Sequence, residues 1–342
     1  MKKIMMILMV IMFAFTCVGG SVFILADIPA AVQEDKDKNA SEDSGDNETS
    51  TTASGYWSSS SYYASSFEGG TGTSSDPYLI SNAEQLARLA YLSNSSSYYS
   101  SYNSKTYQLT DDIDLSAHYW IPIGLKYAFQ GNFYGNYHTI KGMTCYMSSG
   151  TDSNYYATAD NANSYICALF GKVYGDAAIF NFSLSNVSIT TASASMSTKY
   201  YKFSAVAGLV LASSDNTPMI SNVNLFGNIK SSLTGTATEF LMAGAVCYTE
   251  GAVISNVSSY MTMYDSSNMS TSSSSTSICG GIAAFITSES FVIKCAMLGY
   301  IDFYGFGGGN TYAGGIVGQL GGSSTLKTSY VTRGGYHTNT SS

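Results

Sequence analysis

The sequence predicts an all-β fold: a right-handed parallel β-helix (a solenoid) with an N-terminal capping α-helix. Charged residues make up only 11% of the 342 residues, and 28 Tyr and 33 Gly accompany abundant Ser. This composition suits stacked strands joined by tight turns, whereas a helical bundle needs many Glu, Lys, Ala and Leu. Small apolar blocks also recur at a nearly regular spacing in the second half of the chain, which is typical of a repeat fold.

The N-terminus has the pattern of a targeting segment. Lys2 and Lys3 precede an apolar span that extends from Ile4 to Ala26. A signal peptide cleaved after Ala26 or Ala31 fits this pattern, and the span is also long enough to cross a bilayer as an uncleaved signal anchor. Residues 1–26 are therefore assigned as a signal peptide or signal anchor. Both alternatives predict that the rest of the chain is exported.

Residues 27–68 are predicted to be a disordered linker. The stretch from Glu34 to Glu48 is acidic, and residues 49–66 are rich in Ser, Thr and Tyr. Such a segment has too little apolar surface to bury a core. It would hold the folded part away from a membrane, and metal binding by its carboxylates is the alternative.

Residues 69–165 are assigned to an N-terminal cap and the first coils. After a turn and a short strand, Ser81-Asn82-Ala83-Glu84 has the pattern of a capping box, with Ser at the N-cap and Glu at N3. A helix is expected to follow, to about Ser93, and to bury one apolar face, formed by Leu86, Leu89, Ala90 and either Tyr91 or Leu92. Because the first coil of a solenoid exposes its apolar interior, this helix is the expected cap. Short strands punctuated by Gly and Asn follow, in segments 107–115, 120–124, 129–136 and 138–143.

Residues 166–342 are predicted to form the main β-helix repeats. Five small apolar blocks have their second residues at positions 168, 208, 244, 281 and 315, so the intervals are 40, 36, 37 and 34. Each block precedes a strand-like run by a nearly constant offset, and these runs begin at Ile179, Ile220, Ile254, Ile293 and Leu326. The offset from block to run is nearly constant, whereas the interval between successive blocks varies. This indicates that two sides of each coil have a fixed length and that the third side carries loops of different length. Small residues in the blocks allow the chain to crowd at a corner of each coil.

Asn181, Asn222 and Asn256 occupy the same position of three successive runs. Stacked Asn side chains hydrogen-bond along the axis of parallel β stacks. We therefore predict a structural ladder, in which Cys295 and Thr328 replace Asn in the last two coils.

Five cysteines lie beyond the targeting segment, and an odd number cannot all pair within one chain. We expect buried thiols that act as small apolar side chains. Cys279 and Cys295 are the exception that the fold could bring together.

Several motifs resemble those of the GLUG-motif proteins of bacterial surfaces. The repeat motif is similar to Gly314-Gly315-Ile316-Val317-Gly318 followed by Leu326-Lys327-Thr328-Ser329-Tyr330. The N-terminal segment of such proteins resembles residues 70–80 with Ala83-Glu84-Gln85-Leu86, and similar segments cover 109–115, 121–124 and 129–142. The resemblance spans about residues 69–342, although middle blocks such as Ala243-Gly244-Ala245-Val246 lose glycines. It implies a secreted or wall-associated, adhesin-like protein with parallel β-helical repeats and no shared catalytic residues.

No catalytic, cofactor-binding or metal-binding residues are predicted, and no cofactor. Some proteins with such repeats resemble exported zinc peptidases, which need an H-E-x-x-H motif. The histidines are His118, His138 and His337, and none has a neighbouring Glu. A zinc peptidase is therefore excluded. A net charge of −8 without a basic patch also excludes a nucleic-acid partner.

The function that we expect is adhesin-like binding to host, matrix or glycan surfaces, without catalysis. The partner would be an extracellular protein or glycan, with attachment to a membrane or cell wall as a further possibility. Exposed aromatic rings would supply contacts, and pairs of Tyr in loop-like stretches suggest them: Tyr98-Tyr99, Tyr155-Tyr156 and Tyr200-Tyr201. The chain stops directly after a repeat, so we expect either a longer protein or another chain to cover the last coil.

The alternative function is that of a β-helical carbohydrate-active enzyme, similar to a polysaccharide lyase or glycosidase. Such sites need carboxylates, or Lys and Arg with Asp, converging on adjacent coils. The carboxylates of the repeats share no repeat position: Asp176, Asp215, Glu239, Glu250, Asp265, Glu289 and Asp302. Asp111, Asp112 and Asp114 are the best candidates for catalysis or calcium binding, but the preferred interpretation is a solvated turn whose carboxylates cap backbone amides. Three or more ionisable side chains converging in one groove would favour an enzyme.

Overall fold

The structure of the protein, a computed structural model, describes residues 53–147, 156–158, 164–191, 195–270, 275–305, 309–332 and 336–337. They belong to one unit, Thr51–Ser342. The predicted targeting segment, residues 1–26, and the acidic part of the predicted linker lie outside the described residues.

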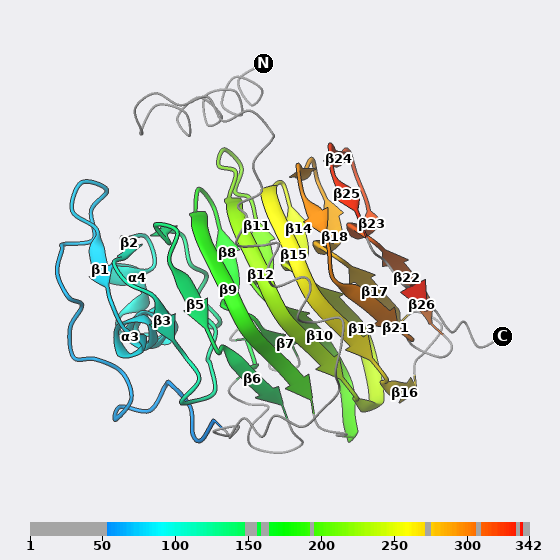
Figure 1. Cartoon of the computed structure of the whole chain (residues 1–342), viewed down its shortest axis with the longest axis horizontal. Helices are drawn as coiled ribbons and strands as arrows, with labels where there is room; N and C mark the ends of the chain where they lie inside the picture. The colour runs from blue at the N-terminus through cyan, green and yellow to red at the C-terminus, as the bar shows by residue number, and fades with distance from the viewer. Residues whose placement is uncertain are drawn as a thin grey trace. The chain divides into compact units, whose positions relative to one another are not determined.

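Three parallel sheets wind into a solenoid, and each full coil passes from sheet C to sheet B to sheet A (Figure 1). Sheet C contains β7 (Ser164–Cys167), β10 (Ser195–Ser204), β13 (Thr234–Ala243), β16 (Asn268–Ser270), β17 (Thr276–Gly280) and β22 (Asn310–Gly314). Sheet B contains β8 (Phe170–Tyr174), β11 (Ala207–Leu211), β14 (Val246–Glu250), β18 (Ala283–Thr287) and β23 (Val317–Leu320).

Sheet A is the longest and runs from the first coils to the last. It contains β1 (Tyr78–Ile80), β2 (Thr106–Leu109), β3 (Ile113–Asp114), β4 (Asn132–Tyr134), β5 (Thr139–Lys141), β6 (Thr144–Met147), β9 (Ala178–Thr191), β12 (Met219–Ser231), β15 (Val253–Asp265), β19 (Phe291–Ile293), β20 (Ala296–Met297), β21 (Tyr300–Phe303), β24 (Thr325–Lys327), β25 (Tyr330–Val331) and β26 (Tyr336–His337). Neighbouring strands of successive coils pair in parallel, as β9, β12 and β15 do over most of their length. The predicted all-β parallel solenoid is confirmed.

The predicted helix covers the N-terminal end of the solenoid. Helix α3 (Ala83–Asn94) is followed by the short α4 (Tyr99–Tyr102). Leu86 and Leu89 of α3 are fully buried in the same apolar core as Leu109 and Ile113 of the first coils. The apolar face of the helix therefore closes the interior, as expected for a cap.

The helix begins one residue later than the predicted capping box. Asn82 is the N-cap, and its side chain accepts a hydrogen bond from the backbone N–H of Gln85 at 3.0 Å. The Gln85 side chain in turn accepts from the backbone N–H of Ser81 at 2.8 Å. Asn82 and Gln85 thus replace Ser81 and Glu84 as the capping pair, because an amide oxygen caps as well as a hydroxyl.

Residues 53–68, which the sequence suggests are linker, are packed instead. Trp57 is only 3% exposed, and its indole N–H donates to the carbonyl of Leu115 at 3.1 Å. Tyr62, Tyr63 and Phe67 also pack against the core. Aromatic rings in this Ser-rich stretch supply the apolar surface that the linker prediction overlooked.

The strand register corrects one predicted repeat equivalence. In sheet B, the first residues of successive strands pair with one another, and they lie at positions 170, 207, 246, 283 and 317. The intervals between them are therefore 37, 39, 37 and 34. Ala205, and not Gly208, therefore corresponds to Gly244 of the next coil, whose carbonyl accepts from the Ala205 N–H. Gly208 lies within β11, whose small apolar residues resemble those of a corner block in sequence. The block predicted from the sequence is therefore three residues too late.

The predicted Asn ladder is present in the first repeats. Asn181, Asn222 and Asn256 have positive φ angles of 63°, 56° and 51° at one corner of sheet A. Asn tolerates this left-handed conformation better than most residues. Asn222 Nδ2 donates to Asn181 Oδ1 at 2.9 Å, which links two successive coils.

The end of the ladder differs from the prediction by one residue. Lys294, with φ 54°, takes the Asn position in the fourth coil, and Cys295 does not. Val292 rather than Ile293 pairs with Ile254, which shifts the run by one residue. The prediction aligned Ile293 with Ile254 because both are Ile. In the structure Val292 is the residue that pairs with Ile254, and its side chain is buried in the core.

The cysteines are buried free thiols, as predicted. This holds for Cys145, Cys167, Cys247, Cys279 and Cys295. Cys279 and Cys295 therefore form no disulfide with each other.

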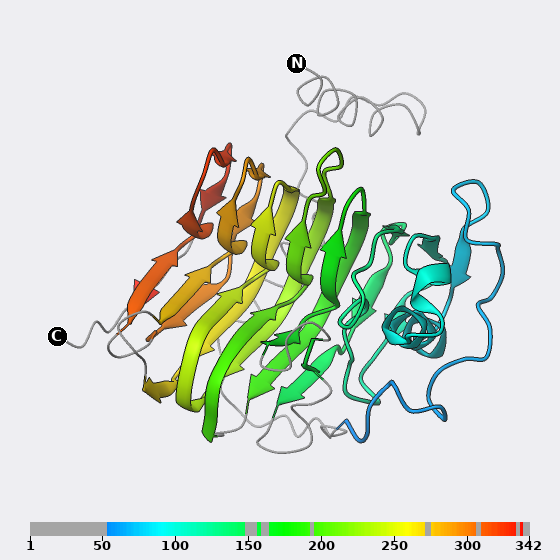
Figure 2. The same cartoon turned by 180° about the vertical axis from the view of Figure 1, so that it is seen from behind.

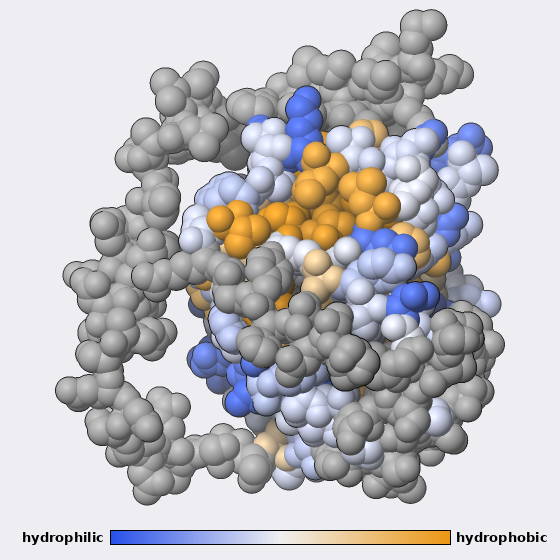
Figure 3. All heavy atoms as spheres, turned by 90° about the vertical axis from the view of Figure 1, so that its right-hand side faces the viewer, coloured by the Kyte–Doolittle hydropathy of each residue, from blue (hydrophilic) through white to orange (hydrophobic). Residues whose placement is uncertain are grey.

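The C-terminal end of the solenoid differs from its capped beginning. Apolar side chains of the last coils are well exposed, such as Leu320 at 48% and Leu326 at 43%. Figure 3 views the molecule from this end and shows an apolar surface there. Within the described part of the chain, no helix has both the length and the apolar character needed to cross a membrane.

Candidate functional site

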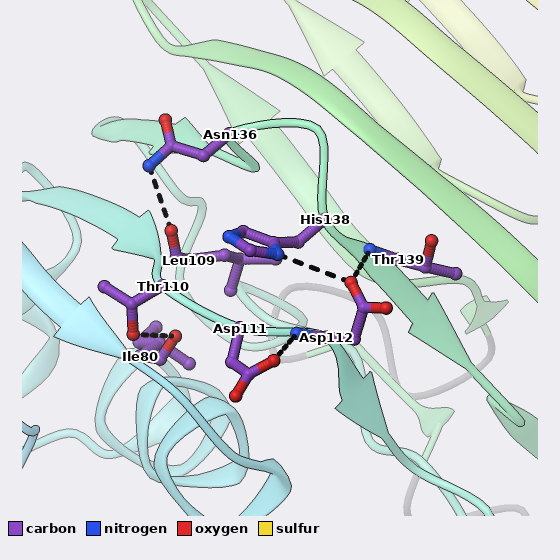
Figure 4. A network of polar contacts seen from close by, with 8 residues as sticks. All are labelled: Ile80, Leu109, Thr110, Asp111, Asp112, Asn136, His138 and Thr139. Atoms are coloured by element: carbon purple, nitrogen blue, oxygen red, sulfur yellow. Dashed lines mark hydrogen bonds and ion pairs between the residues drawn. The ribbon is translucent and has the colours of Figure 1, made fainter.

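The predicted acidic cluster lies at a turn between coils, where its carboxylates bind backbone amides (Figure 4). Asp111 Oδ1 accepts from the backbone N–H of Asp112 at 2.7 Å. Asp112 Oδ1 accepts from the backbone N–H of Thr139 at 2.8 Å and lies 3.4 Å from His138 Nδ1. Asp111 thus stabilises its own turn, and Asp112 links that turn to the segment of His138 and Thr139.

Asp114 has different partners. Its Oδ1 accepts from the Ser116 N–H at 3.0 Å, and its Oδ2 lies 3.4 Å from Lys141 Nζ. Burial raises the pKa of Asp114, but hydrogen bonds from Ser116 and Lys141 outweigh it and hold that pKa below its usual value. No group of His, Cys, Asp or Glu in the described residues is arranged to hold a metal ion. The cluster fits the turn-capping alternative.

A groove lies on the outside of the solenoid, where sheets C and B meet. Figure 2 shows these sheets from behind as two adjoining rows of parallel strands. Strand β10 ends at Ser204 and β11 begins at Ala207, so two residues turn the chain from one sheet to the other. The cavity has a volume of about 290 Å³ and is lined by Thr158, Ser164, Lys172, Tyr200, Lys202, Leu209, Glu239 and Tyr248. We call it the lateral groove.

Strand alternation explains which side chains of sheet C reach the groove. Tyr201 and Phe203 are fully buried in the core. Because side chains alternate along a strand, Tyr200 and Lys202 project from the outer face. The register then places Tyr200 beside Glu239 of the next coil.

Sheet B supplies the opposite wall. Lys172, Leu209 and Tyr248 are register partners on three successive strands. They form a row along the solenoid axis that faces the row from sheet C across the corner. Residues far apart in the sequence are thereby brought to one surface.

An ion pair spans two coils on the sheet C side. Lys202 Nζ lies 2.5 Å from Glu239 Oε1, and the two side chains are 8% and 28% exposed. Lys202 Nζ also lies 5.7 Å from the centre of the Tyr200 ring, within reach of a cation–π interaction. This ammonium is nearly removed from water, which is costly unless it is paired.

Two further lysines lie at the same end of the groove. Lys172 is 7% exposed, and its Nζ donates to the carbonyl of Lys126 at 3.2 Å. The Lys126 ammonium donates to the carbonyl of Ala157. Burial, and then the positive charge of Lys172, lowers the pKa of Lys126. Lys126, Lys172 and Lys202 thus come from three consecutive coils, and Lys202 is paired with Glu239.

The sequence analysis missed this site. It compared carboxylates at equal repeat positions, whereas Lys172, Lys202 and Glu239 converge from different positions on two sheets. A usable signal was present, because Lys202 stands between Tyr201 and Phe203 in an apolar strand. The criterion of three ionisable side chains in one groove, set above for an enzyme, is met.

The tyrosine pairs divide between surface and core. Tyr98 and Tyr99 are exposed, at 44% and 36%. Tyr156 and Tyr201 are fully buried, so neither ring is exposed as expected, and Tyr201 lies in strand β10 rather than in a loop. Tyr200 lines the lateral groove, and only this member of the two later pairs is placed to contact a ligand; Tyr155 lies outside the described residues.

Beyond Glu239 the same corner is filled with apolar side chains. A second apolar cluster, separate from the main core, contains Leu241, Ala243, Cys247, Ile278 and Ala284, with Tyr248 and Phe285 packed against it. The groove is therefore open and charged in the earlier coils and closed and apolar in the later ones.

Comparisons with known proteins support the fold and give no family. No family model matches the chain, and no curated protein matches it. The solved structure of a "putative immunoglobulin A1 protease" from Bacteroides ovatus is similar, with a TM-score of 0.51 and 19% identity over 80% of each chain. At this identity the similarity shows a shared solenoid fold alone.

Proposed function

We propose that this protein is a secreted or surface-attached, adhesin-like protein that binds an extracellular glycan in the lateral groove, without catalysis. The observation that carries the proposal is the pair of nearly buried lysines, Lys172 and Lys202, beside tyrosine rings in one groove. Buried charges contribute little to stability, so their presence is better explained by recognition. The signal-like N-terminus and the GLUG-like motifs support an exported, surface-associated protein.

A glycan fits the groove better than an extended peptide does. Peptides that bind sheets usually pair with a free strand edge. Here β10 is paired with β7 and β13, and β11 is paired with β8 and β14. The groove therefore offers side chains rather than backbone, and the rings of Tyr200 and Tyr248 can pack against sugar faces.

A carbohydrate-active enzyme is the second candidate, and the convergence of Lys172, Lys202 and Glu239 favours it. A glycosidase needs two carboxylates around the bond to be cleaved, and among the described residues that line the groove Glu239 is the one carboxylate. A lyase needs a base and a cation, and in this groove Lys202 is already bound to Glu239 at 2.5 Å. Binding without cleavage therefore explains the geometry with fewer requirements.

The test is a binding screen of the protein against immobilised neutral and charged extracellular glycans. We expect at least one class to bind, and we expect Tyr200→Ala with Tyr248→Ala to weaken that binding about thirtyfold, because each ring contributes about 1 kcal/mol. Tyr137→Ala is the control, since Tyr137 is 80% exposed on a turn and absent from the groove. If no glycan binds, or if the double variant binds normally, the proposal fails. Cleavage of a bound glycan would favour the enzyme instead.

A further inference from the structure

A second cavity lies at the capped end of the solenoid and shares no lining residue with the lateral groove. Its volume is about 200 Å³, and it is lined by residues of β1, α3, α4 and the packed segment before β1 (Figure 1). Its lining includes Phe67, Gly69, Gly70, Tyr78, Arg88 and Tyr102. We call it the cap pocket.

One wall of the cap pocket is bare backbone. Gly70 has a φ of 81°, a left-handed conformation that glycine adopts without strain, and a Cβ added there would lie 1.8 Å from the carbonyl oxygen of Pro77. Gly69 forms an antiparallel bridge with Leu79 of β1. The turn is thereby fixed against β1, and its two glycines leave the wall without side chains.

Arg88 brings a positive charge to the cap pocket. Its Nη1 donates to the carbonyl of Ala64 at 3.0 Å, and its Cζ lies 5.6 Å from the centre of the Phe67 ring. Within the described residues, its Nε is buried without a hydrogen-bond partner, and no carboxylate forms an ion pair with its guanidinium. Glu68, which follows Phe67, accepts instead from Thr110 Oγ1 at 2.9 Å. The described part of the chain therefore does not neutralise this charge.

The guanidinium has donors to spare. An arginine carries five N–H donors in a planar fork that matches the two oxygens of a carboxylate. Among the described residues, Ala64 is the acceptor for Arg88, and even Glu84, one turn earlier on α3, does not pair with it. A carboxylate in the cap pocket would supply the missing partner.

Aromatic rings form the apolar part of the cap pocket. The ring centres of Phe67 and Tyr78 lie 4.7 Å apart, and those of Tyr78 and Tyr102 lie 6.0 Å apart. Burial, and then the charge of Tyr102, raises the pKa of Tyr78, although Arg88 acts to lower it, so the phenol stays neutral at pH 7. Neutral rings beside one guanidinium suit a ligand that has both an apolar face and a carboxylate.

The size and the hydroxyl groups of the cap pocket favour a sugar. A cavity of roughly 150 Å³ holds one benzene ring, so about 200 Å³ suits one six-membered ring with its carboxylate. Ser66, Tyr78 and Tyr102 carry hydroxyl groups that can exchange hydrogen bonds with the hydroxyls of a sugar. An aromatic acid would leave these groups without partners.

We infer that the cap pocket binds a sugar acid, with Arg88 contacting its carboxylate and Tyr78 and Tyr102 contacting its ring. This is a second site, which takes one acidic sugar residue. It goes beyond the proposed function, because none of its residues belongs to the lateral groove and its ligand binds independently of that groove.

The experiment begins with the wild-type protein and small ligands that differ in one group. Binding is measured by ligand-observed NMR titration with glucuronate, its uncharged amide glucuronamide, benzoate and acetate. We expect glucuronate to bind at least tenfold more tightly than glucuronamide, because only the acid can pair with the guanidinium. We also expect it to bind at least tenfold more tightly than benzoate or acetate, because neither presents a hydroxylated ring.

Variants of Arg88 then separate binding from a structural role. In Arg88→Met the ratio of the glucuronate affinity to the glucuronamide affinity should fall from at least ten to about one. Arg88→Lys keeps the charge and loses the fork, so we expect an intermediate ratio. If Arg88 serves only to hold Ala64, its loss would weaken both ligands and leave their ratio unchanged, which would overturn the inference. Lys230→Met is the matched control, because Lys230 is an exposed cation on β12 of sheet A.

A milder variant tests the ring contacts. Tyr102→Phe removes one hydroxyl and keeps the backbone carbonyl of Tyr102, which accepts from Tyr107 Oη at 2.8 Å. We expect it to weaken glucuronate and glucuronamide alike, by about threefold, and unchanged binding of both would remove Tyr102 from the site. Thermal unfolding verifies that each variant is folded, and if Arg88→Met does not fold, Arg88→Lys and the wild-type comparison decide.

The outcomes also separate this inference from the proposed function. Tyr200→Ala with Tyr248→Ala should leave glucuronate binding unchanged, and its loss in that variant would place the ligand in the lateral groove and overturn the inference. Equal binding of acid and amide, benzoate binding as tight as that of glucuronate, or no binding of glucuronate would overturn it as well. None of these three results alters the outcome of the glycan screen for the lateral groove.

Discussion

The corner between sheets C and B contains two halves with the same backbone and opposite contents. In the charged half, Lys172, Lys202 and Glu239 surround an open cavity. In the apolar half, Leu241 and Ile278 occupy the positions next to Lys202 in the register, and both are buried. The solenoid is held by its interior core, so the outer corner is free to vary. The apolar half stabilises the coils, and the charged half forms the lateral groove.

The largest effect is expected when a charge is moved into the apolar half. Ile278 is 2% exposed and packs within the second apolar cluster. Ile278→Lys would bury an ammonium without a carboxylate partner, and we expect a loss of about 3 to 5 kcal/mol in the free energy of unfolding, measured in urea. The control Ile278→Val should lose about 1 kcal/mol. Equal losses in the two variants would show that the apolar half tolerates charge as the charged half does.

The second effect tests how tightly the corner itself is packed. A Cβ added to Gly280 would lie 1.9 Å from the carbonyl oxygen of Ala283, which belongs to the backbone and cannot rotate away. We expect Gly280→Ala to cost about 2 to 3 kcal/mol in the same urea measurement.

Ser204 provides the comparison from the charged half, because it holds the equivalent register position two coils earlier. Its Oγ donates to the carbonyl of Ala207 at 2.7 Å. Ser204→Ala should lose this bond and the contact with the Cys247 thiol, and cost about 1 kcal/mol. If Gly280→Ala lowers the free energy of unfolding less than Ser204→Ala does, the corner is packed no more closely in the apolar half than in the charged half.

Local patterns predicted much of the fold. The helix after Asn82, the small residues at the corner and the Asn ladder all follow from residues close together in sequence. The prediction failed where equivalence depends on the register, as at Ala205 and Lys294, because a small shift along the chain leaves the composition of a run almost unchanged.

The site could not be predicted in the same way. Lys172 and Glu239 lie far apart in sequence, on different sheets and at different repeat positions. Only the corner of the folded coil brings them together. Asp111, Asp112 and Asp114 are close in sequence, and this proximity made them the more visible candidates although their hydrogen bonds serve turns.

The third effect is smaller and concerns the ion pair of the charged half. Glu239→Gln would leave the 8% exposed Lys202 without its partner, and we expect a loss of about 1 to 2 kcal/mol, reduced from that of a fully buried pair because Glu239 is 28% exposed. The double variant Lys202→Met with Glu239→Gln should lie within about 1 kcal/mol of the wild type, since both charges are removed. A double variant less stable than the single one would show that the pair stabilises the fold, which would weaken the argument that it exists for recognition.

The smallest effect leaves stability unchanged and compares chemical reactivity in the two halves. Burial raises the pKa of the Cys247 thiol to about 12, so at pH 8 only about one thiol in 10⁴ would be ionised. We therefore expect iodoacetamide to leave Cys247 unmodified in the folded protein and to modify it rapidly in urea, as followed by peptide mass spectrometry.

In the charged half the pKa shift favours reactivity instead. Burial and the charge of Lys172 lower the pKa of Lys126, which favours its acylation. Cys247 should stay unreactive at the pH at which Lys126 is acylated. Rapid alkylation of Cys247 in the folded protein would show that the apolar half opens to water, and the contrast between the halves would then be one of composition alone.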